Sequence, residues 1–494
     1  MNSFDLDTTL IELHGENGAG EWTVRDAVEG VQIFGGIGSG KTSGSGRMIA
    51  LKFLKAGFGG LVLTVKPDEK EDWVKYAKLA GRENDLIVVE PNGKYFFNFL
   101  EYESAGTGGL TENIVQVLKT VIHASEEKAG GGNDDPFWET ALDMLIFNVI
   151  DLCKLAYGKV SVQIMFDIVQ TLPRDGQADT KEGKQTAFQK AFTLARDNVT
   201  QQIEVWEASL SADELEEAQG QNYEEILCKS IADARTLKFI DQFFLESFMN
   251  LSEKTRSIID FSFSGFLFRL LRDPVYSLFC NQPSNVFPEN CLDGKIIILN
   301  LPVKIYHKIG RDSQIMFKYI WQRAMEKRNV KENGRPVFLW ADEAQNFLHE
   351  HDAEYQATAR SSRISTVYIT QNLPNYLANM GGAKSEFRVK SFLGTLATKI
   401  FHANADMETN RYASELIGDG YFEDTSKTST AAGQFSSSHT RSLKIDRIVR
   451  PEAFTGLKTG GTRNAAKVEG YMHLQGNPLG HIKVLFDQDF TVNP

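Results

Sequence analysis

The feature that most constrains this fold is a glycine-rich run, GGIGSGKT, at residues 35–42. The run fits the pattern GxxxxGK[ST], follows the short apolar segment Val31–Phe34 and precedes residues 47–57, which have helical spacing. A strand, a loop and a helix in this order form the context in which such a loop wraps its backbone N–H groups around a phosphate. The sequence therefore predicts a P-loop.

Each fixed position of the loop has a chemical task. Glycines let successive amides turn toward the phosphates, and the helix N-terminus adds a partial positive charge. Lys41 is expected to reach the β- and γ-phosphates of ATP, and Thr42 to offer its hydroxyl to Mg²⁺. The predicted nucleotide-binding residues are Gly35, Gly36, Ile37, Gly38, Ser39, Gly40, Lys41 and Thr42.

A second segment offers the acids that a P-loop enzyme needs. Residues 337–341 form an apolar run that predicts a buried strand, and Asp342 and Glu343 follow directly. We expect Asp342 to hold Mg²⁺ through water and Glu343 to polarise the attacking water. A second acid at this place favours hydrolysis over transfer to another substrate. The run TVYITQ at 366–371 predicts the next strand and places Gln371 at its end, where an amide can contact both the γ-phosphate and the water.

The order of predicted elements indicates one α/β domain interrupted by helices. Strand-like runs at 61–65, 86–90, 296–301 and 398–403 alternate with helical segments, whereas residues 110–280 consist of long amphipathic segments. The prediction is an α/β fold, a RecA-like P-loop NTPase core with an inserted all-α domain. Its expected boundaries are 1–105 and 285–494 for the core and 106–284 for the insertion.

Composition narrows the class further. The chain has 494 residues and a net charge of −12, so a nucleic-acid partner is not implied by bulk charge. No window approaches the length of apolar residues that a bilayer span requires, so no transmembrane segment of its own is expected, and the acidic N-terminus lacks the features of a secretory signal. The four cysteines show no CxxC pairing and are expected to be core residues.

Two segments have unusual composition. Residues 197–228 hold nine acids and no Lys or Arg, which is typical of a solvated helical face, and residues 424–441 are rich in Ser and Thr and are expected to form a flexible loop. Residues 433–470 hold seven basic residues against three acids. This patch is either a DNA contact or ordinary surface charge.

Taken in order, these motifs resemble a known family. A P-loop, an all-α insertion, a strand ending in Asp-Glu, an arginine eleven residues before Gln371, and the block FLGTLATKIFHANADMETNRYASELIG at 392–418 resemble the coupling proteins of conjugation and type IV secretion. These form the TraG/TraD-like branch of the FtsK–HerA superfamily. The last block is more specific than the two nucleotide motifs, which many unrelated NTPases share.

The resemblance implies a homo-hexameric ring ATPase that passes DNA, without sequence preference, through a central pore. It also implies that Arg360 completes the catalytic site of a neighbouring subunit, with Arg363 as the rival for that role. Relaxase, adaptor or secretion-channel proteins are implied partners. The location would be cytoplasmic, or peripheral at the inner membrane through those partners.

Two departures from the family pattern bear on these expectations. Relatives usually begin with membrane-spanning helices, whereas this P-loop begins 34 residues from the start of the sequence. Many relatives have an Asp before the Lys of the second strand, and here Thr64 and Val65 precede Lys66. Two alternatives to a coupling-protein motor stay open: a soluble HerA-like ATPase subunit of a DNA-processing or phage-defence complex, and an ATP-gated adaptor that recruits relaxase or effector proteins without translocation.

Overall fold

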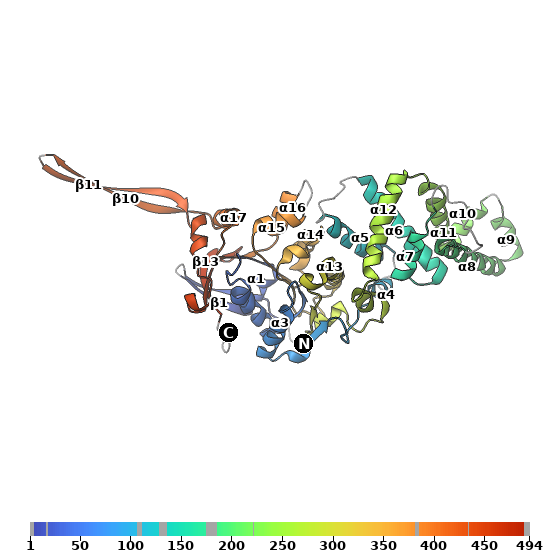
Figure 1. Ribbon diagram of the computed structural model, residues 1–494, viewed down its shortest axis with the longest axis horizontal. Coiled ribbons are helices and arrows are strands. Elements are labelled where there is room, and N and C mark those ends of the chain that lie inside the picture. The colour runs from blue at the N-terminus through green and yellow to red at the C-terminus, as the bar shows by residue number, and fades with distance from the viewer. Residues whose placement is uncertain are drawn as a thin grey trace. The chain divides into compact units, whose positions relative to one another are not determined.

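The chain divides into two compact units. The structure is a computed structural model that describes residues 4–15, 18–105, 111–127, 136–173, 185–220, 222–380, 385–432 and 434–488. Unit 1 comprises Met1–Val88, Pro288–Asn300 and Trp321–Pro494, and unit 2 comprises Val89–Phe287 and Leu301–Ile320 (Figure 1). These boundaries differ from the predicted domain boundaries at residues 89–105, 285–287 and 301–320.

A nine-stranded sheet forms the centre of unit 1. Its spatial order is β13-β12-β9-β3-β8-β7-β4-β6-β5. The strands are β3 (Val31–Phe34), β4 (Gly59–Leu63), β5 (Leu86–Val89), β6 (Ile296–Leu299), β7 (Val337–Ala341), β8 (Ile364–Thr370), β9 (Thr398–His402), β12 (Lys467–Leu474) and β13 (His481–Asp487). The seven strands predicted from the sequence all contribute to it, as β3 to β9.

The central strands run parallel, which fixes where the site lies. Strand β3 pairs in parallel with β8 and β9, and β7 pairs in parallel with β4 and β8. All residues of β3, β4, β6 and β7 are buried, as expected for a parallel sheet covered on both faces. Since Phe34 is opposite Thr370 and Ala341 is opposite Tyr368, the chain leaves β3, β7 and β8 at the same edge.

Helices of unit 1 pack on this sheet. They are α1 (Val24–Val28), α2 (Arg47–Lys55), α3 (Glu69–Leu79), α14 (Asp352–Ala359), α15 (Leu373–Met380), α16 (Ser385–Gly394) and α17 (Met407–Ile417), with the end of α13 (Val303–Lys327). Phe53 of α2 stacks on Phe58 and Phe338, and Trp73 of α3 stacks on the same Phe338. This aromatic cluster anchors α2, and with it the P-loop that precedes α2, to the sheet.

Antiparallel strands extend the sheet in a way the sequence analysis did not predict. Strand β12 pairs antiparallel with β9 and with β13. The N-terminal strands β1 (Thr9–Gly15) and β2 (Gly18–Thr23) form a separate antiparallel pair.

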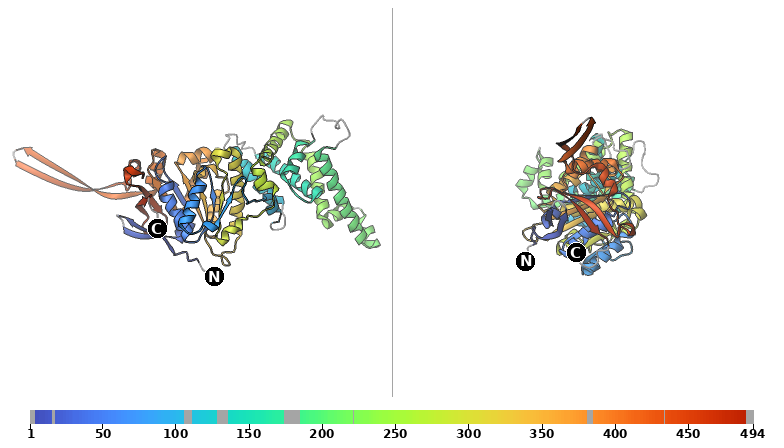
Figure 2. Two further views of the ribbon diagram at one scale, coloured as in Figure 1. Left: turned by 60° about the horizontal axis from the view of Figure 1, so that its bottom comes forward. Right: turned by 90° about the vertical axis from the view of Figure 1, so that its left-hand side faces the viewer.

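The prediction of a flexible loop over 424–441 is wrong. Strands β10 (Asp419–Ala432) and β11 (Gln434–Arg447) cover that segment and pair antiparallel in unbroken register (Figure 2). The threonines of this segment have high strand propensity, and the segment lacks the apolar spacing from which a helix could build a core. Low apolar content was therefore misread as irregular structure.

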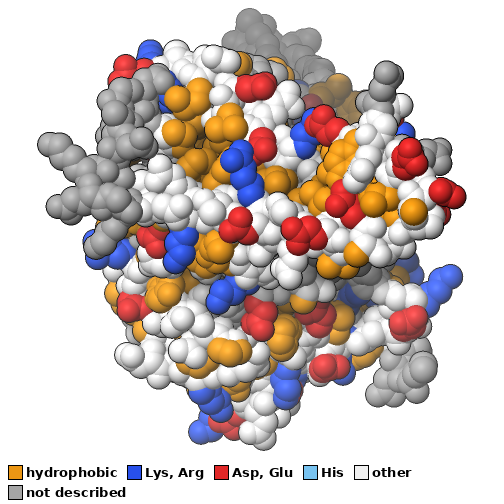
Figure 3. Space-filling model, turned by 90° about the vertical axis from the view of Figure 1, so that its right-hand side faces the viewer, with side chains coloured by type: hydrophobic (Ala, Val, Ile, Leu, Met, Phe, Trp, Pro, Cys, Tyr) orange, Lys and Arg blue, Asp and Glu red, His pale blue; other side chains and the backbone are white. Residues whose placement is uncertain are grey.

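Unit 2 is helical. Its helices are α4 (Phe99–Ala105), α5 (Thr111–Glu127), α6 (Pro136–Tyr157), α7 (Val162–Gln170), α8 (Ala187–Ser209), α9 (Ala212–Ala218), α10 (Tyr223–Ser230), α11 (Ala232–Gln242), α12 (Glu253–Leu270) and most of α13. Apart from Val89 at the end of β5, its described residues include no strand. Figure 3 shows a face of the molecule on which hydrophobic side chains lie among charged ones of both signs.

The four cysteines are free, and Cys153, Cys280 and Cys291 are buried, as expected for core residues. Within the described ranges, no helix combines the length and the hydropathy that a membrane crossing demands.

Candidate active site

The P-loop connects β3 to the helix that follows it. Gly38 and Gly40 have φ angles of 70° and 81°, in the left-handed region that glycine adopts without strain. A Cβ atom on Gly40 would lie 2.5 Å from Cγ2 of Val468 in β12, so the loop also needs glycine there for close packing. The first turn after the loop, Thr42–Gly46, is a wide π turn that leads into α2.

The loop fits the phosphates of a nucleotide. Ser39 is 1% exposed, and its Oγ has no hydrogen-bond partner within the described part of the chain. A buried hydroxyl without a partner is costly unless a ligand satisfies it. Lys41 is also buried, while Ile37 at the tip of the loop is 90% exposed. Ser39 Oγ therefore has no protein acceptor at the place where a phosphate would supply one.

Asp342 connects the acidic strand to the P-loop. Thr42 Oγ1 donates a hydrogen bond of 2.9 Å to Asp342 Oδ2, and Lys66 Nζ donates one of 3.2 Å to the same oxygen. Asp342 Oδ1 accepts a 2.9 Å hydrogen bond from the backbone N–H of Glu343. Thr42 and Asp342, both predicted as metal ligands, thus face each other with a hydroxyl and a carboxylate, and oxygen ligands of this type suit Mg²⁺.

Glu343 lies between the P-loop and β8. Its Oε1 is 4.0 Å from Lys41 Nζ and accepts a 3.3 Å hydrogen bond from Gln371 Nε2, while Oε2 accepts one of 2.9 Å from Gln345 Nε2. The residue has a φ of 50°, a backbone conformation that is uncommon for a non-glycine residue and is enriched at functional sites. The structure therefore brings Lys41, Glu343 and Gln371 together from three separate strand ends.

Sequence analysis missed two residues beside Asp342. Lys66 contacts it directly, and Glu69 lies nearby at the start of α3, where its Oε2 accepts a 2.7 Å hydrogen bond from the Val65 N–H. Burial, reinforced by the charge of Asp342, raises the pKa of Glu69 to about 8. A cavity of about 20 Å³ lined by Thr42, Glu69 and Asp342 among others has room for a single water molecule. The signal in the sequence was Glu69 itself, an acid at the start of the helix that follows the second strand of the core.

His402 contacts the first turn after the P-loop through Ser45. The residue is 1% exposed; its Nε2 lies 2.7 Å from Ser45 Oγ, and its Nδ1 lies 2.9 Å from the backbone oxygen of Glu469 in β12. Burial lowers the pKa of His402 to about 4, so the ring is neutral. The P-loop helix, β9 and β12 are thereby joined through one side chain.

Arg360 does not join this group. It lies between α14 and β8, whereas Gln371 directly follows the seven-residue β8, and a strand of that length spans about 23 Å. Its side chain is 61% exposed and forms an ion pair with Glu29 at 3.2 Å. Arg363 instead donates hydrogen bonds to the backbone oxygens of Phe4 and Gly334 at 2.8 and 2.7 Å. Arg360 is thus the more accessible of the two arginines.

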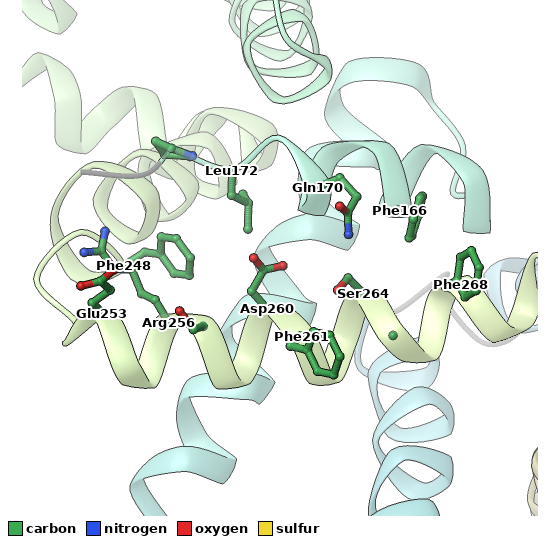
Figure 4. A pocket seen from close by; sticks show the side chains of 13 residues that line it. Phe166, Gln170, Leu172, Phe248, Glu253, Arg256, Asp260, Phe261, Ser264 and Phe268 are labelled. Atoms are coloured by element: carbon green, nitrogen blue, oxygen red, sulfur yellow. The ribbon is translucent and has the colours of Figure 1, made fainter. Parts of the chain in front are cut away.

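A larger cavity lies within unit 2, between α7 and α12. It has a volume of about 770 Å³, and Figure 4 shows Asp260 and Gln170 pointing toward the space between the two helices. Phe166 and Phe268 come together at one end, with ring centroids 6.2 Å apart. The volume falls in the range of ligand sites, and its apolar wall with a few polar groups is typical of them.

Charge is divided unequally between the units. Unit 2 contains 31 Asp and Glu against 21 Lys and Arg, and unit 1 contains 34 against 32. Nearly all of the net charge of −12 therefore belongs to unit 2. Several basic residues predicted as a patch in 433–470 are paired: Arg447 with Asp419 at 2.9 Å, Lys458 with Glu469 at 3.7 Å, and Arg450 with Asp446.

Residues 336–459 match the family described as the TraM recognition site of TraD and TraG. No curated protein matches the chain in sequence.

Solved structures of the conjugative coupling protein TrwB match most of the chain. Its unbound form has a TM-score of 0.60 at 13% identity, covering 95% of this chain and 87% of that one. The complex with the ATP analogue ADPNP has a TM-score of 0.61 at 12% identity, with coverage of 95% and 87%. The complex with ADP and Mg²⁺ has a TM-score of 0.59 at 12% identity, with coverage of 96% and 89%.

These matches establish the fold class. The predicted α/β fold, a RecA-like P-loop core with an all-α insertion, is confirmed, since it is the architecture shared with TrwB. The predicted resemblance to coupling proteins agrees with these findings: this chain has the fold of the coupling protein TrwB, and its residues 336–459 match the family described as the TraM recognition site of TraD and TraG.

Proposed function

We propose that this chain is the ATP-hydrolysing subunit of a coupling-protein-like ring that recruits and translocates DNA or nucleoprotein. The observation that carries the proposal is the convergence on Glu343 Oε1, which lies 4.0 Å from Lys41 Nζ and 3.3 Å from Gln371 Nε2. A phosphate-binding cation, an acid and an amide from three strand ends form the group that hydrolysis of a γ-phosphate needs. The resolved complexes of TrwB, which has the same fold, contain ADPNP and ADP with Mg²⁺.

The roles follow from the contacts. Lys41 and the amides of residues 35–42 bind the phosphates, with Ser39 Oγ as an additional donor. Thr42 and Asp342 would hold Mg²⁺, and the bound ion would supply positive charge against the phosphate oxygens. Glu343 accepts a proton from the water whose oxygen attacks the γ-phosphorus, as the bond to the ADP oxygen breaks. Gln371 positions that water. Asn404 Nδ2 donates a 2.8 Å hydrogen bond to the backbone oxygen of Gln371 and so holds the strand end in place.

Arg360 acts on a neighbouring subunit in this proposal. Within one chain it lies at the end of β8 opposite to Gln371, so it cannot reach its own P-loop. An exposed guanidinium at this edge can neutralise charge on a phosphoryl group bound next door. Arg363 is held by two backbone oxygens and is assigned a structural role.

The proposed partners are DNA and other proteins. Phosphate contacts supply most non-specific affinity for DNA, and unit 1, which is nearly neutral, opposes them less than the acidic unit 2 does. The family matched by residues 336–459 is described by recognition of TraM, and we propose a protein-binding surface in this segment. A homo-hexameric ring follows only from the family resemblance.

An ATPase assay with matched variants tests the chemistry. Lys41→Ala is expected to lose nucleotide binding, and Glu343→Gln to bind ATP but lose turnover, because the amide cannot accept the proton. Glu332→Gln, an exposed acid outside the site, is the control. Turnover of wild-type protein should rise with DNA. Normal turnover in Glu343→Gln would refute the assignment of the base.

Mixing experiments test action between subunits. Lys41→Ala chains mixed with Arg360→Ala chains can form interfaces with an intact loop and an intact arginine, so part of the activity should return. Lys41→Ala mixed with Glu343→Gln is the control, because both lesions lie in one site and no mixed interface is complete. Equal activity in the two mixtures would show that Arg360 does not act in trans.

The cavity of unit 2 favours one alternative, an ATP-gated adaptor. A half-apolar cavity in an acidic helical unit suits capture of a protein segment better than contact with phosphates. ATP turnover that is unchanged by DNA but changed by a relaxase or effector protein would favour the adaptor over the motor.

A further inference from the structure

Strands β10 and β11 form a two-stranded β-ribbon, here called the β-arm. Their register runs without interruption from Asp419 opposite Arg447 to Ala432 opposite Gln434. Each strand has 14 residues, which corresponds to a length of about 45 Å. In Figures 1 and 2 the two strands lie side by side, and among the described elements no third strand pairs with them.

A ribbon of this kind leaves interactions unused. Both outer edges expose unpaired backbone N–H and C=O groups, and a two-stranded ribbon alone is marginally stable in water. The β-arm also exposes apolar side chains near its base: Tyr421 is 75%, Leu443 71% and Ile445 61% exposed. Tyr421 is opposite Ile445, and Leu443 lies two residues further on the same face. This face has the composition of a surface that is covered in an assembly.

The two edges carry opposite charges. Strand β10 contributes Asp419, Glu423 and Asp424 against Lys427, while β11 contributes Arg441, Lys444 and Arg447 against Asp446. Glu423, Asp424 and Arg441 are exposed and form no salt bridge with any described side chain. Lys444, which is 64% exposed, lies 3.8 Å from Asp446. The acidic β10 edge of one copy is therefore complementary in charge to the basic β11 edge of another copy.

We propose that β-arms of adjacent copies pair edge to edge, β10 of one copy against β11 of the next. In a ring all β-arms point the same way, so the strand that runs outward in one copy meets the strand that runs back in the next, and the antiparallel order continues. Such contacts are head-to-tail and close when the ring closes. Closure removes every free edge, as in an up-and-down barrel with two strands per copy.

The register that joins the charges also suits closure. A stagger of two residues relative to the register within one arm keeps each side chain on its face and places Glu423 opposite Arg441 of the partner subunit. Tyr421 then lies opposite Leu443 of the partner subunit. Barrels require such a stagger because their strands tilt relative to the axis. Cross-strand pairs of opposite charge and of apolar side chains both stabilise neighbouring strands.

Cysteine cross-linking tests the pairing in the full-length protein. Glu423→Cys and Arg441→Cys are placed in separate chains that also carry Cys228→Ser, and the chains are mixed and oxidised. The head-to-tail arrangement predicts 423–441 dimers in the mixture and none in either variant alone. Ser442→Cys in place of Arg441→Cys is the matched control, since it lies on the opposite face and should cross-link at least tenfold less. Efficient 423–423 dimers, or no dimers in protein that has assembled, would overturn the proposal.

Charge reversal provides a second, independent test. Glu423→Lys with Asp424→Lys, and Arg441→Glu with Lys444→Glu, should each weaken oligomer formation at least tenfold, as measured by sedimentation. Mixing the two variants restores opposite charges at every interface although each arm keeps like charges internally. Recovery in the mixture thus supports pairing between copies, and failure to recover indicates that the charges serve only the single arm.

Other occupants of the β-arm would give different results. If the charge-reversal variants assemble normally but no longer bind a fluorescent DNA duplex, the pairing is overturned and the β-arm is a nucleic-acid contact. The proposal rests on the ring of the proposed function but not on its chemistry: a Lys41→Ala chain without ATPase activity should still yield 423–441 dimers, so failure of the ATPase assignment and failure of the pairing are distinguishable.

Discussion

His402 provides the sharpest prediction about stability, because its two contacts define its protonation. Its Nδ1 faces the backbone oxygen of Glu469, which can only accept, so Nδ1 carries the hydrogen and Nε2 accepts from the Ser45 hydroxyl. Protonation of Nε2 would break the contact with Ser45 at the P-loop helix. Burial accordingly lowers the pKa of His402 to about 4, against about 6.5 for an unperturbed histidine.

The sign and size of the effect follow from this difference. Between about pH 4 and 6.5 the unfolded chain binds a proton at this position and the folded chain does not, so the free energy of unfolding falls as pH is lowered through this window. The pKa difference of about 2.5 units corresponds to about 3 kcal/mol, with a limiting slope of about 1.4 kcal/mol per pH unit.

Urea unfolding of unit 1 at several pH values checks the prediction. His402→Gln keeps a donor and an acceptor but does not titrate, so its stability should decline less on acidification than that of wild type. The difference between the two proteins should approach about 3 kcal/mol at the acidic end. His14→Gln, which removes an exposed histidine of β1, is the control. Parallel pH profiles of wild type and His402→Gln would refute the reasoning.

Three further changes have defined outcomes. Lys399→Met should raise the melting temperature at neutral pH and the free energy of unfolding by up to about 3 kcal/mol, because burial lowers the pKa of Lys399 to about 8. The wild-type chain should regain that stability as pH rises from about 8 to 10.5, and calorimetry at both ends of this range checks the prediction. Gly40→Ala should reduce ATP affinity at least tenfold by titration calorimetry, and Val468→Ala should restore only part, because the φ of 81° still disfavours alanine. Arg363→Ala should lower the melting temperature, whereas Arg360→Ala should leave it unchanged and lower kcat, and the reverse pattern would exchange the roles of the two arginines.

Local patterns sufficed for the parts of the fold that are specified locally. The P-loop and the strand before Asp342 each combine an apolar run with a polar terminus, so their residues could be recognised without knowledge of the fold. Parallel strands end at one edge of a sheet, and for that reason Gln371 could be predicted to lie near them.

Other features depend on contacts between distant segments. The antiparallel addition of β12 to β9 joins residues about 70 positions apart, and nothing in either segment specifies the partner. The position of Glu69 beside Asp342 depends on how α3 packs on the sheet, and its raised pKa depends on burial. The β-arm was missed because residues 424–441 lack the alternation of apolar and polar residues that identifies most strands.

The position of β12 in the chain has a mechanical consequence. This strand begins 20 residues after the β-arm ends, packs Val468 against Gly40 and holds His402 beneath Ser45. A load on the arm therefore has a short covalent route to the residues that we propose bind a phosphate. Linkage is reciprocal: if tension on β12 lowers the affinity of the P-loop for its ligand, then dissociation of the ligand lowers the tension on β12. Force on the β-arm and release of the nucleotide would then both be coupled to movement of the same strand, β12.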